Sequence, residues 1–198
     1  MTFTLNLKHS VLNKIVLIGA STGGPGQIEK IINKLPALND TSIIIAQHMI
    51  DEFIPSFAKR LREHTLNPIS VTKSNTPLNS GEIYLCSGLT KIIKNGSVFS
   101  FSNEPIEKNR YNPNINALFY SLVNISDKIE ILCVLLTGIG EDGVDGCRRL
   151  SLDKARCITE SKESAIVDGM PYSARKKVPD IEISDISEII KRIEEFCN

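Results

Sequence analysis

A serine stands in a glycine-rich turn directly after a short apolar run. Residues 15–18 read Ile-Val-Leu-Ile, and residues 19–23 read Gly-Ala-Ser-Thr-Gly, which matches the pattern Gly-x-Ser-x-Gly. A buried strand that enters this pattern and leaves through a helix forms a nucleophile elbow, in which a tight turn exposes the serine hydroxyl at a sheet edge. The pattern also occurs in turns without chemistry. It therefore raises the hypothesis that Ser21 is a nucleophile, provided that a base lies nearby.

Of the three histidines, His48 is the best candidate for that base. It follows a second apolar run at 42–46 through Gln47, whereas His9 lies in the N-terminal segment and His64 stands beside Glu63 at the end of a predicted helix. Imidazole accepts and donates protons near neutral pH, which suits it to activate a hydroxyl. The structural alternative is a capped or half-buried histidine at a strand end.

A third apolar run, at 129–136, supplies a carboxylate. It breaks at residues 137–143, Thr-Gly-Ile-Gly-Glu-Asp-Gly. Because the carboxyl ends of parallel strands meet at one edge of a sheet, we expect Ser21, His48 and either Glu141 or Asp142 to lie together. A nucleophile, a base and an orienting carboxylate are the groups that acyl transfer needs. Alternatively, Asp142 caps the helix that begins near residue 143, and Glu141 is a solvated neighbour.

Residues 138–143 also match the dinucleotide fingerprint Gly-x-Gly-x-x-Gly, with Glu160 and Glu163 about twenty residues further on. Two carboxylates inside the pattern would oppose a bound pyrophosphate, so we do not expect a nucleotide there. The turn at Ser21 carries no Walker lysine, which excludes a phosphate-binding loop of that type.

The elements that position these residues alternate along the chain. Strand-like runs at 15–18, 42–46, 129–136 and 156–159 alternate with helix-like apolar spacing near 28–35, 53–61, 144–151 and 186–193. This order predicts right-handed βαβ units and a largely parallel sheet. A further strand is expected at 83–86 and a helix at 117–123.

The middle of the chain departs from this alternation. Asn95-Gly96 separates strand-like runs at 91–94 and 98–101, which predicts an antiparallel hairpin at about 89–101. Residues 102–114 are polar and contain prolines, so they are expected to form a surface loop.

The composition is that of one globular domain. The chain has 198 residues, 41% of them hydrophobic, and its 23 basic and 23 acidic residues cancel. We therefore expect no electrostatic binding to nucleic acid and no insertion into a membrane, since no apolar run is long enough to span one. The five cysteines are scattered without a Cys-x-x-Cys pair, which argues against a zinc site or a disulfide framework and favours the cytoplasm.

Four segments in this order resemble the catalytic domain of the chemotaxis protein-glutamate methylesterases of the CheB type. They are residues 18–25 (Ile-Gly-Ala-Ser-Thr-Gly-Gly-Pro), 47–49 (Gln-His-Met) with Phe-Ala-Lys-Arg-Leu at 57–61, 136–143, and 168–171 (Asp-Gly-Met-Pro). The resemblance implies an α/β fold with a doubly wound, mostly parallel sheet and helices on both faces. It covers roughly residues 14–180.

The resemblance also implies site residues. Ser21 corresponds to the nucleophile, His48 to the base and Asp142, rather than Glu141, to the orienting carboxylate. The backbone amide of Ile139, where the family usually has methionine, corresponds to part of the oxyanion hole. We expect the amide of Thr22 to complete it, and Gly23, Gly140 and Met170 to line the site. Neither a metal nor an organic cofactor is expected.

Several positions around the site depart from the family pattern. Ile50 replaces a common proline, residues 112–116 (Asn-Pro-Asn-Ile-Asn) replace Arg-Pro-Ser-Val-Asp, Glu160-Ser161 replaces Gln-Asp, and Asp168 replaces an apolar residue. The positions that would carry the chemistry are retained, so these changes bear on substrate preference and rate.

The resulting hypothesis is hydrolysis of glutamate methyl esters on the cytoplasmic domain of chemoreceptors, with deamidation of receptor glutamines as a further activity. The alternatives are a receptor-binding module with weak catalysis and a small-molecule esterase or amidase. We expect an N-terminal tail at 1–13, a catalytic domain at 14–198 and no receiver domain. The enzyme would then be either constitutively active or controlled by a separate regulatory protein.

Overall fold

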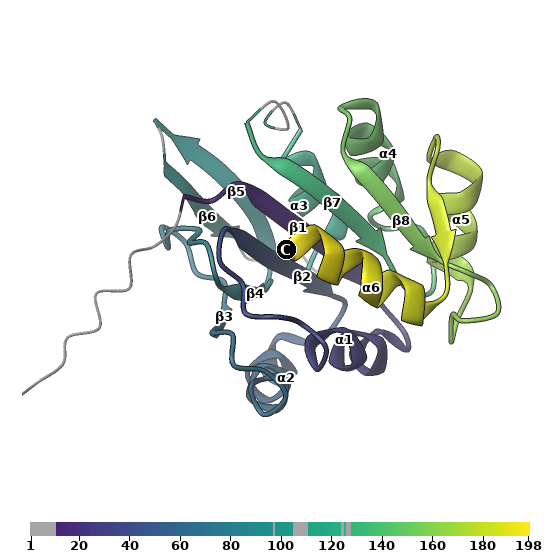
Figure 1. Cartoon of the computed structure of the whole chain (residues 1–198), viewed down its shortest axis with the longest axis horizontal. Coiled ribbons are helices and arrows are strands. Elements are labelled where there is room, and N and C mark those ends of the chain that lie inside the picture. The colour runs from purple at the N-terminus through teal and green to yellow at the C-terminus, as the bar shows by residue number, and fades with distance from the viewer. Residues whose placement is uncertain (1–10, 97, 105–110, 124, 126–127) are drawn as a thin grey trace, which may run out of the picture.

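Seven parallel strands form the central sheet. In this computed structural model, which describes residues 11–96, 98–104, 111–123, 125 and 128–198, they are β1 (Lys14–Ala20), β2 (Thr41–Gln47), β3 (Ile69–Val71), β4 (Ile83–Leu85), β7 (Glu130–Leu135), β8 (Arg156–Glu160) and β9 (Glu182–Ser184). Their order across the sheet is β3-β4-β2-β1-β7-β8-β9 (Figure 1). The strand that leads to Ser21 therefore lies between the strands that lead to His48 and to the 137–143 turn.

Helices cover both faces of the sheet. On one face lie α1 (Gly24–Ile32), α2 (Ile54–Arg62) and α6 (Ile186–Cys197), and on the other α3 (Ile115–Tyr120), α4 (Val144–Leu152) and α5 (Gly169–Lys177) (Figure 1). Successive side chains of β1 point to opposite faces of the sheet. Val16 and Ile18 pack in the apolar cluster beneath α1, α2 and α6, whereas Ile15 and Leu17 pack in the cluster beneath α3, α4 and α5. The predicted doubly wound, parallel fold is confirmed.

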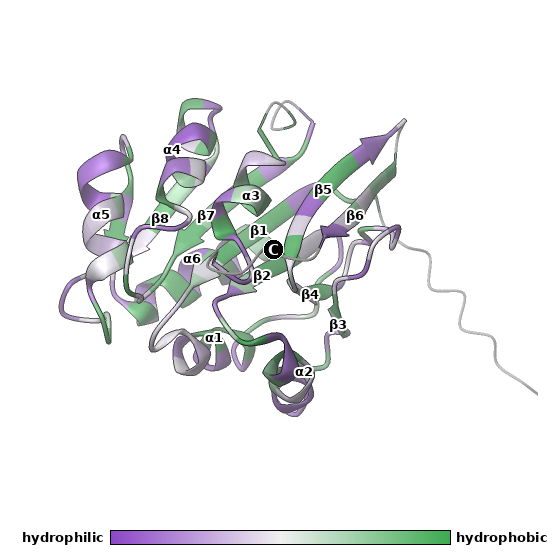
Figure 2. Cartoon of the chain, turned by 180° about the vertical axis from the view of Figure 1, so that it is seen from behind, coloured by the Kyte–Doolittle hydropathy of each residue, from purple (hydrophilic) through white to green (hydrophobic). Residues whose placement is uncertain are grey.

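Hydrophobic residues are concentrated in the strands, and the outer sides of α2, α4 and α5 are hydrophilic (Figure 2). This distribution agrees with a parallel sheet buried on both faces. No helix in the part of the chain that the structure describes is long and apolar enough to cross a membrane.

The predicted hairpin is present beside the main sheet. Strands β5 (Leu89–Asn95) and β6 (Val98–Glu104) pair antiparallel, with Asn95 opposite Val98 at the turn and Gly96 at φ 62°. The expected loop at 102–114 is wrong over its first three residues, which extend β6. Residues 105–110 lie outside the described part of the chain, as does the tail predicted at 1–13 except for residues 11–13.

Short elements at the sheet edges escaped prediction. Strands β3 and β9 have three residues each, too few to show a periodic pattern. Helix α5 begins Gly-Met-Pro and buries few side chains, so its apolar stripe is weak. Other local signals were correct: Pro55 lies in the first turn of α2, and the Asp185 side chain accepts from the Glu188 amide at the start of α6.

Candidate active site

The turns after β1, β2 and β7 lie side by side at the carboxyl edge of the sheet. Ala20 pairs with Gln47 in the register of β1 and β2, and Gly19 pairs with Leu135 in that of β1 and β7. Backbone hydrogen bonds continue from the strands into the turns. The His48 amide donates to the Ala20 carbonyl at 2.9 Å, and the Ser21 amide donates to the Thr137 carbonyl at 3.0 Å. The Ser21 turn is thus held from both sides.

Glycines allow the backbone to pass this closely. Gly23 has φ 85°, in the left-handed region that L side chains rarely adopt, and ends the Ser21 turn at the start of α1. A Cβ on Gly138 would lie 2.6 Å from the Ser21 Cβ, and one on Gly24 would lie 2.0 Å from the Gln47 Oε1. The Gln47 amide group in turn donates to the carbonyls of Ser21 and His48, both at 2.9 Å.

His48 and Asp142 form a direct pair. The His48 Nε2 lies 2.8 Å from the Asp142 Oδ2, and the two side chains are 12% and 1% exposed. Asp142 also accepts from the backbone amides of Ile115, at 2.8 Å, and Asn116, at 3.1 Å, both in the first turn of α3. Two amide donors at a helix N-terminus fix the orientation of this carboxylate.

The alternative that Asp142 caps the following helix is therefore wrong. Helix α4 has Gly143 at its N-cap and no side-chain cap, whereas the Asp142 carboxylate faces His48 and α3. Glu141 points elsewhere, because its exposed side chain is ion-paired with Lys177. The choice of Asp142 over Glu141 as the partner of His48 agrees with this geometry.

Tyr111 covers the His48 ring, a contact that the sequence reasoning missed. The two ring centroids are 4.8 Å apart and the ring planes differ by 7°. The Tyr111 hydroxyl also lies close to Gly140, where an added Cβ would be 3.0 Å away. Residue 111 fell in the predicted surface loop, and only its position directly before the family-like segment at 112–116 could have drawn attention to it.

The residues predicted to line the site gather at the same turns. Within the described part of the chain, the backbone N–H groups of Thr22 and Ile139 have no hydrogen-bond partner, as an oxyanion site would require, and the Ile139 side chain is 64% exposed. Gly23 and Gly140 are in these turns, both with positive φ. Met170 is fully buried behind Gly138 and donates its amide to the Gly138 carbonyl at 2.8 Å, so it supports the turn from inside.

A buried carboxylate lies behind the turns. Glu160, at the end of β8, is completely inaccessible and accepts from the Thr137 amide at 3.0 Å, the Gln27 side chain at 2.5 Å and the Ser164 hydroxyl at 2.8 Å. The Thr137 hydroxyl then donates to the Thr22 carbonyl at 2.9 Å. Glu160 thus connects β8 and α1 to the turn that holds the Ser21 backbone. The sequence patterns marked Glu160 as a departure from the family and as part of the rejected dinucleotide fingerprint, and neither pattern predicted this supporting role.

Other candidate residues have structural partners away from this pair. His64 contacts Glu29 on α1 at 3.0 Å rather than its neighbour Glu63, and Asp168 forms a two-pronged ion pair with Arg175. His9 lies outside the described residues. The described residues bring three metal-ligating side chains close together in one place, a group of cysteines that includes neither His48 nor Asp142.

An apolar groove adjoins the site. Its volume is about 400 Å³, and its lining comes from the start of α1 and from the segment that follows His48: Pro25, Met49, Phe53, Ser56, Phe57 and Arg60. Exposed apolar side chains stand on the same loops, including Ile50 at 63% and Phe53 at 59% exposure. An exposed apolar surface of this kind is typical of an interaction site.

Comparison with known proteins decides the family. The family model of the CheB methylesterase matches residues 16–193. The chain belongs to the CheB methylesterase family. The match covers all the turns described above, so the resemblance of the four sequence segments is confirmed.

Solved and curated relatives agree with this assignment. The crystal structure of the Thermotoga maritima CheB methylesterase catalytic domain superposes with a TM-score of 0.83 at 26% identity, covering 93% of this chain and 99% of that one. Proteins named protein-glutamate methylesterase/protein-glutamine glutaminase from Saccharophagus degradans and Bacillus subtilis are 32% and 33% identical over 92% and 91% of this chain. The chain spans about half the length of these curated relatives, 50% and 51%.

Proposed function

We propose that this chain is a serine hydrolase that removes methyl esters from glutamate side chains of chemoreceptors, with Ser21, His48 and Asp142 as its catalytic triad. The observation that carries the proposal is the 2.8 Å contact between His48 and the buried Asp142, at the strand end next to the one that leads to Ser21. Relatives of this family that are named both methylesterase and glutaminase support the substrate class.

The contact supports a separate role for each imidazole nitrogen in the proposed mechanism. An ionised Asp142 accepts the proton on Nε2, which leaves the lone pair on Nδ1 to accept the proton of the Ser21 hydroxyl. The parallel Tyr111 ring limits rotation of the imidazole out of this orientation. As the Ser21 oxygen bonds to the ester carbonyl carbon, the proton moves to His48, and Asp142 stabilises the imidazolium that forms.

The developing oxyanion would accept from the Thr22 and Ile139 amides, each worth about 2.7–4 kcal/mol in comparable hydrolases. The protonated His48 then gives its proton to the departing methoxide, which leaves as methanol. Water attacks the acyl-enzyme with His48 again as base, and this step releases the glutamate carboxylate and restores Ser21. A glutamine side chain would follow the same route and release ammonia.

The apolar groove beside His48 suits a protein substrate. Side chains such as Met49, Phe53 and Phe57 offer hydrophobic contacts next to the proposed triad, and Arg60, which is ion-paired with Glu29 at 3.4 Å, also lines the groove. An amphipathic receptor helix that carries acidic residues could place a methylated glutamate at Ser21 while its apolar side fills this groove. The methylated cytoplasmic domain of a chemoreceptor is therefore the proposed partner.

The decisive experiment measures methanol release from a methylated chemoreceptor fragment by the wild type and by Ser21→Ala. We expect the substitution to abolish release while the thermal unfolding curve is retained, because the Ser21 contacts within the turn are made by its backbone. Near-normal methanol release by Ser21→Ala would refute the assignment of the nucleophile.

The same preparation separates the alternatives. A fluorophosphonate probe should label one residue, Ser21, in the wild type, and absence of labelling with retained receptor binding would identify a binding module instead. Rapid turnover of simple acyl esters without preference for the receptor fragment would identify a small-molecule esterase.

A further inference from the structure

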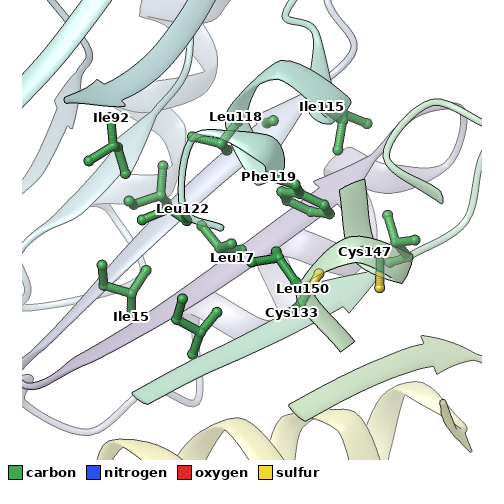
Figure 3. Packing of buried hydrophobic residues seen from close by; sticks show 14 of the residues in the cluster. Ile15, Leu17, Ile92, Ile115, Leu118, Phe119, Leu122, Cys133, Cys147 and Leu150 are labelled. Atoms are coloured by element: carbon green, nitrogen blue, oxygen red, sulfur yellow. The ribbon is translucent and has the colours of Figure 1, made fainter. Parts of the chain in front are cut away.

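Three cysteines that are scattered in the sequence meet inside the protein. Cys133 comes from β7, Cys147 from α4 and Cys157 from β8, and their sulfur atoms all lie within 4.8 Å of one another. Cys133 and Cys157 are register partners on neighbouring strands, and α4 packs against the face of the sheet that carries them. Figure 3 shows Cys133 and Cys147 within the same apolar cluster as Phe119 and Leu150.

We propose that this trithiol site, Cys133, Cys147 and Cys157, binds a trivalent, sulfur-seeking ion of the arsenic(III) class through three sulfur bonds. Bonds from sulfur to such a centre are about 2.3 Å long, and the lone pair of arsenic(III) makes its three bonds pyramidal, so three bound sulfurs stand about 3.5 Å apart. The sulfurs are already within 4.8 Å of one another, so shifts of less than about 1 Å would close the site.

The set of donor atoms excludes hard cations. Among the described residues no carboxylate or imidazole joins the three sulfurs, and magnesium and calcium require oxygen ligands. Soft centres prefer thiolates. The site also lacks the fourth ligand that a structural zinc ion takes in its usual tetrahedral geometry.

The apolar surroundings of the three sulfurs favour an ion whose charge cancels that of three thiolates. All three cysteines are buried in the apolar cluster between the sheet and α3, α4 and α5, with exposures of 0%, 0% and 7%. Three thiolates would leave one negative charge with a divalent ion and two with a monovalent ion, and an uncompensated charge in an apolar interior is costly. A trivalent centre gives a neutral complex.

The binding reaction balances without oxidation. Arsenous acid, As(OH)₃, exchanges its three As–O bonds for three As–S bonds, and each thiol proton leaves with a hydroxide as water. The three sulfurs remain at the thiol oxidation level. No reductant or oxidant is consumed.

The bound ion would cross-link three elements around the candidate active site. The turn between β7 and α4 carries Asp142, and β8 ends at Glu160. Binding to the folded state alone raises stability in proportion to the logarithm of ligand concentration over Kd. We therefore expect loaded protein to unfold at a higher temperature, and loading to be slow because α4 must open first.

The experiment incubates the intact protein, kept reduced by a phosphine, with sodium arsenite. After removal of free arsenite we expect one arsenic per chain by elemental analysis and a mass increase of one arsenic less three hydrogens. X-ray absorption at the arsenic edge should show three sulfur neighbours and no oxygen. Absence of uptake, or a mixed sulfur and oxygen shell, would overturn the proposal.

Variants locate the site, and zinc tests the charge requirement. Cys133→Ala, Cys147→Ala and Cys157→Ala should each lose stoichiometric uptake, whereas Cys86→Ala and Cys197→Ala, which remove buried thiols outside the group, should retain it. Uptake that survives all three cluster substitutions, or tight zinc binding in place of arsenite, would contradict the proposal. The X-ray absorption spectrum of the loaded wild type tests the three-sulfur site even if a cysteine variant fails to fold.

Discussion

The Asp142 carboxylate contacts both the His48 ring and the first turn of α3. It accepts from the His48 ring and from two amides of α3, so it links the candidate base to a helix that is far away in the sequence. An orienting carboxylate must be fixed as well as charged, because a rotated imidazole presents the wrong nitrogen to the nucleophile. Burial and three hydrogen bonds provide that fixation.

We predict that Asp142→Asn lowers kcat for ester hydrolysis about 10⁴-fold, the loss seen when a triad aspartate becomes asparagine. An asparagine amide can donate to Nε2, which would shift the proton to Nδ1 and remove the lone pair that Ser21 needs. Loss of the charged cap at α3 should cost about 1–2 kcal/mol in the free energy of unfolding.

Glu141→Gln is the matched control for Asp142→Asn. It removes the neighbouring carboxylate, which is exposed and paired with Lys177, and should leave kcat within about twofold, since a surface ion pair contributes little. If Asp142→Asn and Glu141→Gln have equal kcat values, Asp142 does not orient the base.

Tyr111 is predicted to act as a positioning residue through its ring. Tyr111→Phe keeps the ring stacked on His48 and should retain most of the activity, whereas Tyr111→Ala removes a contact worth about 0.5–1.5 kcal/mol and should lower kcat by up to about tenfold. Steady-state kinetics on the receptor fragment measures both. A loss confined to KM would show instead that Tyr111 binds substrate.

Among the secondary-structure elements, β8 and α1 support the turn that carries Ser21 through the buried Glu160. The carboxylate receives donors from α1, from the end of β7 and from the 161–168 loop, and Lys30 donates to the other end of the Gln27 amide at 3.0 Å. The Gln27 amide thus lies between the Lys30 ammonium and the buried carboxylate. If Glu160 were apolar, the Thr137 amide and the Ser164 hydroxyl would lose their acceptor, and the Gln27 amide would keep only its longer bond to the Ser164 carbonyl.

Glu160→Leu should therefore destabilise the protein by roughly 3–5 kcal/mol and slow labelling of Ser21 by a fluorophosphonate. Glu160→Gln keeps the shape and one acceptor, and should lose less than about 2 kcal/mol. Urea unfolding and labelling rates test both, with the exposed Glu163→Gln as control. Full stability of Glu160→Leu would show that the network does not hold the turn.

At the scale of the whole molecule, burial fixes the protonation of several core groups. It raises the pKa of the Cys86 thiol from 9.0 to about 12 and that of Cys197 from 9.0 to about 12, and it raises the pKa of the Tyr84 phenol well above 10.0. The folded protein therefore holds these protons more tightly than the unfolded chain does.

Stability should accordingly be full below about pH 9 and fall as the pH rises toward 12. Cys86 alone would contribute a loss of roughly 4 kcal/mol over this interval. Urea unfolding between pH 8 and about 11 measures the slope, which should be shallower in Cys86→Ala. An equal slope in that variant would contradict the assignment to Cys86.

The strands that lead to the site, and the turns that end them, follow from local patterns in the amino-acid sequence. Apolar runs before Gly-x-Ser-x-Gly, before Gln47-His48 and before residues 137–143 fixed β1, β2 and β7, because a buried parallel strand must be apolar on both faces. Their common carboxyl edge predicted that Ser21, His48 and either Glu141 or Asp142 lie together, and the family resemblance then favoured Asp142. These are local patterns joined by one topological rule.

The groups that surround the site, in contrast, are known only from the folded structure. Tyr111 on His48, the α3 amides on Asp142 and the Glu160 network join segments whose spacing in the sequence carries no period. The same holds for the trithiol site, where scattered cysteines gave no ligand spacing and adjacent strands with one helix brought them together. Side-chain contacts between distant segments depend on strand order and helix packing, which no local pattern encodes.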